Sequence, residues 1–240
     1  MKSQLFLQQC LASKYFSDVE MKNTIIRIYG EDCNYKDILE KNTKKLEAFG
    51  LQIIKAVDQI NGDSQYIICN IKHDSLTFLA TTYSYSEITF LKILIDSIIT
   101  AENNSFSISY HDAIRVSSLV GIPSFKQKDA QAALLAFQAD KWLILSKDGK
   151  FLISDRTLTE LHSYLVDIYP DELNNCYVCS AILTAGLVCH GCGKYIHLFC
   201  FKQLSSDHPV PQCLNCNEDY DFPSSYVGVF DRPFPPSSSQ

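Results

Sequence analysis

Apolar residues in the first 85 positions follow first a helical and then a strand-like period. Three segments have the spacing of amphipathic helices: 5–15, 18–29 and 35–49. Two β-prone runs come next, 51–57 and 66–71, on either side of Asn61-Gly62. Asn-Gly favours the tight turn of a β-hairpin. Three helices followed by a hairpin are the order of elements in a winged helix, so we expect a winged-helix-like domain over residues 1–85.

The same order of elements recurs between residues 86 and 170, without residue-level identity to the first half. The helical stretches are 86–100, 110–119, 126–139 and, at the end, 156–168. Two short apolar runs, 142–145 and 151–153, flank a turn centred on Asp148-Gly149. The fold class expected is mostly α with small β-hairpins (α+β), as tandem winged-helix-like domains. An unspecified helical domain with two hairpins stays open as the alternative.

The distribution of charge gives no sign of strong nucleic-acid binding by the first 170 residues. The net charge is −6, and −4 of this lies in residues 171–240, which leaves −2 for the first 170. Lysines and acids alternate on the third predicted helix, so it favours a solvated face over a phosphate track and protein docking over DNA binding. No apolar run reaches the roughly 20 residues of a membrane span, and the N-terminus lacks the pattern of a signal peptide.

Seven of the ten cysteines crowd into 41 residues, and a histidine lies among them. The other three, Cys10, Cys33 and Cys69, are scattered in apolar contexts and are expected to be buried thiols. The eight candidate ligands form four pairs, each with two residues between its members: Cys176 and Cys179, Cys189 and Cys192, His197 and Cys200, Cys213 and Cys216. Such pairs converge on one zinc ion, and each structural zinc takes four ligands. We therefore predict two structural zinc ions, with no open position for catalysis.

Spacing alone does not decide which pairs share a metal. The array resembles RING and PHD fingers, which interleave their pairs in a cross-brace. That resemblance implies one zinc on Cys176, Cys179, His197 and Cys200, and a second on Cys189, Cys192, Cys213 and Cys216. His190 and His208 are expected to be surface residues, because His190 adjoins Cys189 and His208 lies in the long loop.

The two finger families imply different functions. PHD fingers, which read histones, usually carry a tryptophan two residues before the seventh ligand, whereas this chain has Pro211 there. RING fingers dock a ubiquitin-conjugating enzyme through apolar residues of the first and last knuckles, where this chain has Val178 and Leu214. Many active RING fingers place a basic residue after the last ligand, and Asn217 departs from that pattern. Ligase activity is therefore expected to be weak or to depend on a partner.

The whole chain resembles the first non-SMC element, the RING-like subunit of the fifth-and-sixth structural-maintenance-of-chromosomes complex. The resemblance rests on the finger, residues 176–217, and on the two winged-helix-like units before it. It implies a RING-type ubiquitin ligase that binds a MAGE-like winged-helix subunit and the kleisin and acts in DNA repair and recombination in the nucleus. Contact with DNA is expected to be possible only within the complex. A non-enzymatic scaffold and a PHD-like histone reader are the alternatives. The expected domains are 1–85, 86–170, the finger 171–220 and a flexible tail 221–240.

Overall fold

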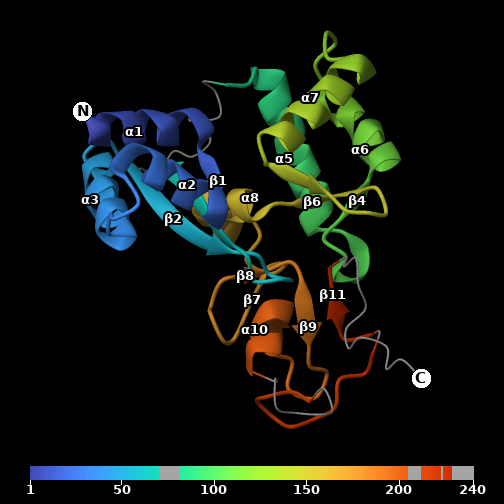
Figure 1. The fold of residues 1–240 in the computed structure, drawn as a ribbon. Helices are drawn as coiled ribbons and strands as arrows, with labels where there is room; N and C mark the ends of the chain where they lie inside the picture. The colour runs from blue at the N-terminus through green and yellow to red at the C-terminus, as the bar shows by residue number, and fades with distance from the viewer. Residues whose placement is uncertain (71–81, 205–211, 223, 229–240) are drawn as a thin grey trace. The chain divides into compact units, whose positions relative to one another are not determined.

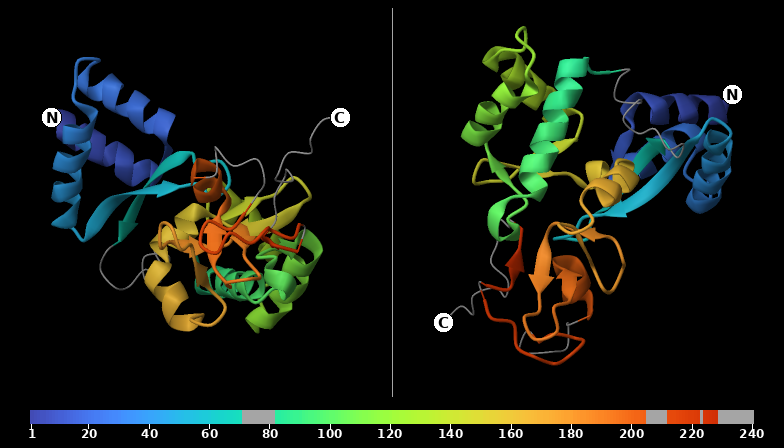
Figure 2. Two further views of the ribbon diagram at one scale, coloured as in Figure 1. Left: turned by 90° about the horizontal axis from the view of Figure 1, so that it is seen from below. Right: turned by 180° about the vertical axis from the view of Figure 1, so that it is seen from behind.

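The computed structural model describes residues 1–70, 82–204, 212–222 and 224–228 (Figure 1; two further views are in Figure 2). These residues fall into two compact units. The first is drawn from Met1–Asp58, Asp63–Tyr83 and Asp155–Leu165, and the second from Gln59–Gly62, Ser84–Ser154 and Val166–Gln240. Within the described part of the chain, no helix combines the length and apolar character needed to cross a membrane.

The first unit is a winged helix with a short strand after its first helix. Its elements run α1 (Lys2–Ser13), β1 (Tyr15–Ser17), α2 (Asp18–Tyr29), α3 (Tyr35–Glu47), β2 (Leu51–Val57) and β3 (Ser64–Asn70). The strands form an antiparallel sheet in the order β1-β3-β2. A capping box between Ser17 and Glu20 starts α2. The apolar faces of the helices and sheet then meet in one core, which includes Phe6, Met21 and Ile68.

The second unit contains the same topology a second time. Its elements run α5 (Tyr85–Ile99), β4 (Ile108–Ser109), α6 (Tyr110–Val116), α7 (Gln127–Ala139), β5 (Leu143–Leu145) and β6 (Lys150–Ile153). The sheet order, β4-β6-β5, repeats first-third-second. Phe90 of α5 is fully buried, and its ring lies 5.5 Å from that of Phe125 and 6.3 Å from that of Phe137. The two winged helices therefore have the same order of elements and the same strand order.

Three local expectations are corrected by the structure. The helix predicted over 156–168 is divided into α8 (Asp155–Glu160) and α9 (His162–Ile168). Backbone hydrogen bonds from Leu161 to Thr157 and from Leu165 to Leu161 continue across the division, and four of the six residues of α8 are buried. Strands β1 and β4 escaped prediction because they are too short to show a period. Cys10 and Cys69 are buried, but Cys33 is only partly buried, in the loop between α2 and α3.

The finger follows in the second unit as small antiparallel strands around one short helix. Its elements are β7 (Asn174–Asn175), β8 (Ile182–Leu183), β9 (Gly186–Val188), β10 (Tyr195–His197), α10 (Leu198–Leu204) and β11 (Tyr226–Val227). Strands β10, β9 and β11 form one sheet in that order. The described part of the tail predicted to be flexible contains a strand, while residues 223 and 229–240 lie outside the described residues. Val227 is 1% exposed, so its burial against β9 holds residues that looked unstructured in the sequence.

Candidate metal centre

Three of the four ligand pairs lie in knuckles of one geometry. In each, the residue after the second cysteine donates its backbone N–H to the carbonyl of the first, at 2.7 to 2.8 Å. That residue has a positive φ: +62° at Ser180, +68° at Gly193 and +60° at Asn217. Asparagine tolerates this left-handed conformation better than most side chains. The structure thus gives a backbone reason for Asn217, the position where the sequence departs from many active RING fingers.

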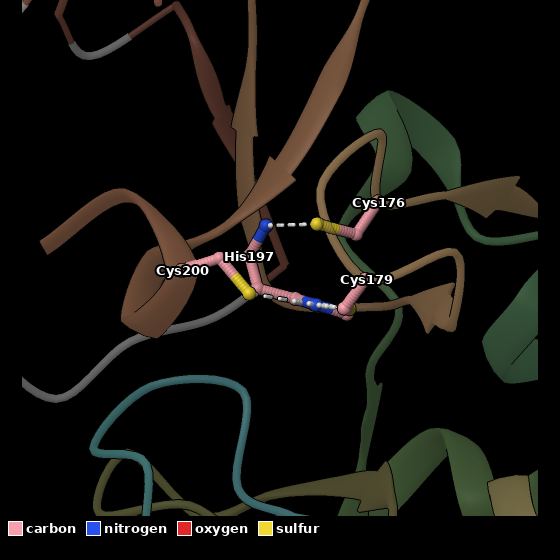
Figure 3. A group of neighbouring side chains, drawn as sticks. All are labelled: Cys176, Cys179, His197 and Cys200. Atoms are coloured by element: carbon pink, nitrogen blue, oxygen red, sulfur yellow. Dashed lines mark hydrogen bonds between the residues drawn. The ribbon is translucent and has the colours of Figure 1, made fainter. Parts of the chain in front are cut away.

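The first cluster gathers Cys176, Cys179, His197 and Cys200, whose ligand atoms all lie within 4.8 Å of one another. Figure 3 shows the three sulfurs and the imidazole converging from a loop, the end of β10 and a helix. His197 Nδ1 lies 3.2 Å from Cys179 Sγ and 3.9 Å from Cys200 Sγ. Its Nε2 lies 3.1 Å from the Ile182 carbonyl oxygen, which can only accept, so Nε2 carries the proton. The lone pair of Nδ1 is therefore directed at the sulfurs, as metal ligation requires.

The second cluster consists of cysteines alone: Cys189, Cys192, Cys213 and Cys216. Cys189 Sγ lies 3.5 Å from Cys216 Sγ, and Cys192 Sγ lies 3.7 Å from Cys213 Sγ. These separations are far from the roughly 2.05 Å of a disulfide and close to the ~3.8 Å edge of a tetrahedron with ~2.3 Å zinc–sulfur bonds. All four cysteines are free thiols, so this cluster has the dimensions of a four-thiolate metal site.

Hydrogen bonds lower the pKa of one thiol in each cluster, whereas the pKa values of Cys179, Cys189, Cys200 and Cys216 are raised. Burial raises the pKa of the Cys176 thiol, but hydrogen bonds from the backbone, among them the N–H of His197 at 3.4 Å from Cys176 Sγ, bring that pKa down to about 6. The backbone N–H of Lys194 is the main cause that lowers the pKa of Cys192 to about 7. A thiolate, rather than a thiol, is the metal ligand. Each cluster therefore holds a cysteine prepared for metal near neutral pH.

The clusters alternate along the chain, because pairs one and three share the first and pairs two and four the second. This interleaving decides between the two arrangements that spacing left open. It yields two cross-braced Cys/His clusters consistent with zinc binding in a RING-like domain. A family described as "RING-like domain" matches residues 176–216, the span of the eight residues.

A second family, described as "Nse1 non-SMC component of SMC5-6 complex", matches residues 3–161. This chain belongs to the Nse1 family. The human "Non-structural maintenance of chromosomes element 1 homolog" is 29% identical over 196 residues, which cover 82% of this chain and 72% of that protein. The Schizosaccharomyces pombe "Non-structural maintenance of chromosomes element 1" is 26% identical over 200 residues, 82% of each chain. The fold is also similar to that of a chain in an "Nse1-Nse3-Nse4 complex", with a TM-score of 0.77, 21% identity and coverage of 91% of this chain and 96% of that one.

The other residues singled out from the sequence lie at the surface or outside the described residues. Val178 is 41% exposed in the first knuckle, and Leu214 is partly buried in the last. His190 is exposed and belongs to neither metal cluster. Its Nε2 lies 3.4 Å from Ser224 Oγ. His208 and Pro211 lie outside the described residues. Sequence reasoning missed the Ile182 carbonyl that orients His197, because a backbone acceptor leaves no signal in residue type.

Proposed function

We propose that this chain is a RING-type ubiquitin ligase subunit of an SMC5-6 complex, acting in the nucleus in DNA repair and recombination. The observation that carries the proposal is the cross-braced pair of Cys/His clusters in the finger of a member of the Nse1 family. A scaffold whose finger serves only assembly is the competing function.

Zinc is the metal proposed for both clusters. A Cys₃His and a Cys₄ set are the donor types that structural zinc takes, and the sulfur separations suit a tetrahedral ion. The first zinc would be held by Cys176, Cys179, His197 and Cys200, the second by Cys189, Cys192, Cys213 and Cys216. A finger of this size buries too little apolar surface to fold alone, and zinc supplies the missing free energy, about 10–16 kcal/mol for a structural site.

The finger's proposed role is positioning. All four ligands of each zinc would come from the protein, so no open metal position is needed for chemistry. A RING-type ligase instead holds a conjugating enzyme and its ubiquitin in a reactive geometry, which lowers the entropic part of the barrier. Val178, exposed in the first knuckle, and Leu214 in the last are the proposed docking residues. Asn217 supplies no positive charge beside them, which agrees with an activity that a partner increases.

The proposed partners are a MAGE-like subunit related to Nse3 and a kleisin related to Nse4. The similarity to a chain of an Nse1-Nse3-Nse4 complex supports both. Two winged helices offer apolar surface for such docking; Leu135 of α7, for example, is 70% exposed. Contact with DNA is proposed only within the assembled complex, since the described surface charge is mixed. On α3, for example, Lys44 pairs with Glu40 at 2.7 Å.

Ubiquitin transfer by the zinc-loaded full chain tests the proposal, with a panel of conjugating enzymes and with and without the MAGE-like partner. The partner should increase transfer, and Val178→Ala and Leu214→Ala should each reduce it while two zinc ions per chain remain. Val19→Ala is the matched control, because Val19 is an exposed valine of the first unit. Transfer absent under every condition would favour the scaffold, whereas transfer unchanged in both finger variants would contradict Val178 and Leu214 as the docking residues.

A further inference from the structure

A turn far from the finger in sequence makes hydrogen bonds to it. Residues Gln59–Gly62 join β2 to β3 along the chain but belong to the second compact unit. Gln59 is 9% exposed, and its Oε1 accepts hydrogen bonds from the backbone N–H groups of Thr184 at 2.9 Å and Ala185 at 3.0 Å. Its Nε2 donates to Thr184 Oγ1 at 3.4 Å. One buried carboxamide thus satisfies the backbone of the turn between β8 and β9.

The backbone of Gln59 holds a second part of the finger. Its carbonyl oxygen accepts the N–H of Phe199 at 2.9 Å, and Phe199 lies between the candidate ligands His197 and Cys200. Gly62 also packs against Phe199, because a Cβ added to Gly62 would clash with the Phe199 ring. Lys202 Nζ also donates to the Ile60 carbonyl at 3.3 Å. The turn therefore contacts the first turns of α10, the helix that carries Cys200.

The two segments that Gln59 contacts, Thr184–Ala185 and Phe199, both adjoin residues of the first cluster or its hydrogen-bond partner. The turn at Thr184–Ala185 continues from β8, whose Ile182 carbonyl accepts a hydrogen bond from His197 Nε2. Phe199 follows His197 by two residues. The second cluster lies on Cys189, Cys192, Cys213 and Cys216, and none of the hydrogen bonds described for Gln59 goes to those knuckles. Partners that orient a metal-ligating histidine typically contribute 10- to 100-fold to metal affinity.

We propose that Gln59 is a positioning residue for the first metal cluster, supporting His197 and Cys200 from a segment outside the finger. This inference rests on the zinc occupancy proposed above. Gln59 is not a ligand; it holds the two backbone segments between which His197 is oriented. Both clusters take all their ligands from the finger, but only the first is supported by residues 59–62 through the hydrogen bonds described for Gln59.

Competition with a zinc chelator measures the zinc affinity of each cluster in the full-length, zinc-loaded protein. Gln59→Met keeps the side-chain length and the backbone bond to Phe199 but removes the side-chain hydrogen bonds to Thr184 and Ala185. It should weaken one of the two zinc equivalents, by at most the roughly 10- to 100-fold that loss of a direct partner of a ligating histidine costs. Gln59→Glu keeps an acceptor for both N–H groups and should restore that equivalent to within a few-fold of wild type. Gln203→Met is the matched control, since Gln203 is exposed on α10. Cobalt substitution identifies the weakened site, because Cys₃His and Cys₄ sets give different visible spectra.

Selective loss of the Cys₃His spectrum supports the proposal. A Gln59→Met protein that binds both equivalents as wild type does, or that weakens both equally, overturns it. If Gln59→Met does not fold, amide exchange in the zinc-loaded wild type decides: slow exchange at Thr184, Ala185 and Phe199 upholds the contacts, and exchange at the rate of exposed loops overturns them. A wild-type chain purified without zinc would contradict the proposed zinc centres themselves. The number of zinc ions per wild-type chain therefore distinguishes failure of the zinc proposal from failure of the Gln59 proposal.

Discussion

Removing one member of a buried ion pair in the first unit should destabilise that unit strongly. Arg156 Nε lies 3.1 Å from Glu160 Oε2 on α8, and the two side chains are 5% and 0% exposed. Breaking a buried pair by removing one partner costs about 3–5 kcal/mol, because the remaining charge loses its compensation inside the protein. Glu160→Leu and Arg156→Met should each lower the free energy of unfolding by this amount. The double variant should recover most of the loss, because an apolar pair of similar volume needs no compensation.

Buried thiols of the same unit provide the assay. Cys10 and Cys69 are both 2% exposed or less, and burial raises the pKa of each to about 12, so both react only when the unit opens. At about 1.4 kcal/mol for each factor of ten, a loss of 3–5 kcal/mol accelerates their labelling roughly 150- to 5,000-fold. Peptide mass spectrometry measures each thiol separately, with the partly buried Cys33 as an internal reference.

The control is the exposed pair Glu40–Lys44 on α3, with side chains 69% and 67% exposed and the same i,i+4 spacing. Glu40→Leu should leave the labelling of Cys10 and Cys69 close to wild type, because exposed pairs contribute little. If Glu160→Leu and Arg156→Met change labelling no more than Glu40→Leu does, the buried pair does not stabilise the unit. If the double variant is as unstable as the two singles combined, the loss comes from packing and not from charge.

Three further outcomes are expected. Burial raises the pKa of Glu160 above its ordinary 4.5, although Arg156 opposes this, so the folded state retains a proton that the unfolded state releases. Relative to Glu160→Gln, the wild-type free energy of unfolding should therefore fall as pH rises from 4.5 through the raised pKa, and urea titrations at several pH values measure it. Cys189→Ser should reduce zinc from two ions per chain to one or none by atomic emission. Gly186→Ala should speed zinc release to a chelator, because its Cβ would lie 2.2 Å from the Ile196 carbonyl and part β9 from β10.

The sequence by itself determined most of the helices, both hairpins and the residues that form the metal clusters. α2 and β2 begin and end at the predicted residues 18–29 and 51–57. Local forces set these elements: a capping box begins α2, and Asn61-Gly62 adopts the turn between β2 and β3, with φ +82° at Gly62. Likewise, three of the four pairs with two intervening residues form knuckles whose defining hydrogen bond spans only four residues.

Tertiary structure decided the features that depend on contacts distant in sequence. Strands β1 and β11 are too short to show a period and exist because β3 and β9 offer them an edge. The cross-brace became certain only when the knuckles were placed in space, since spacing allowed two pairings. Gln59 carries no motif, and its carboxamide gains a role only where the fold brings Thr184 and Phe199 beside it. Local sequence fixes conformations within a few residues, but hydrogen bonds between segments more than 120 residues apart exist only once the chain has folded.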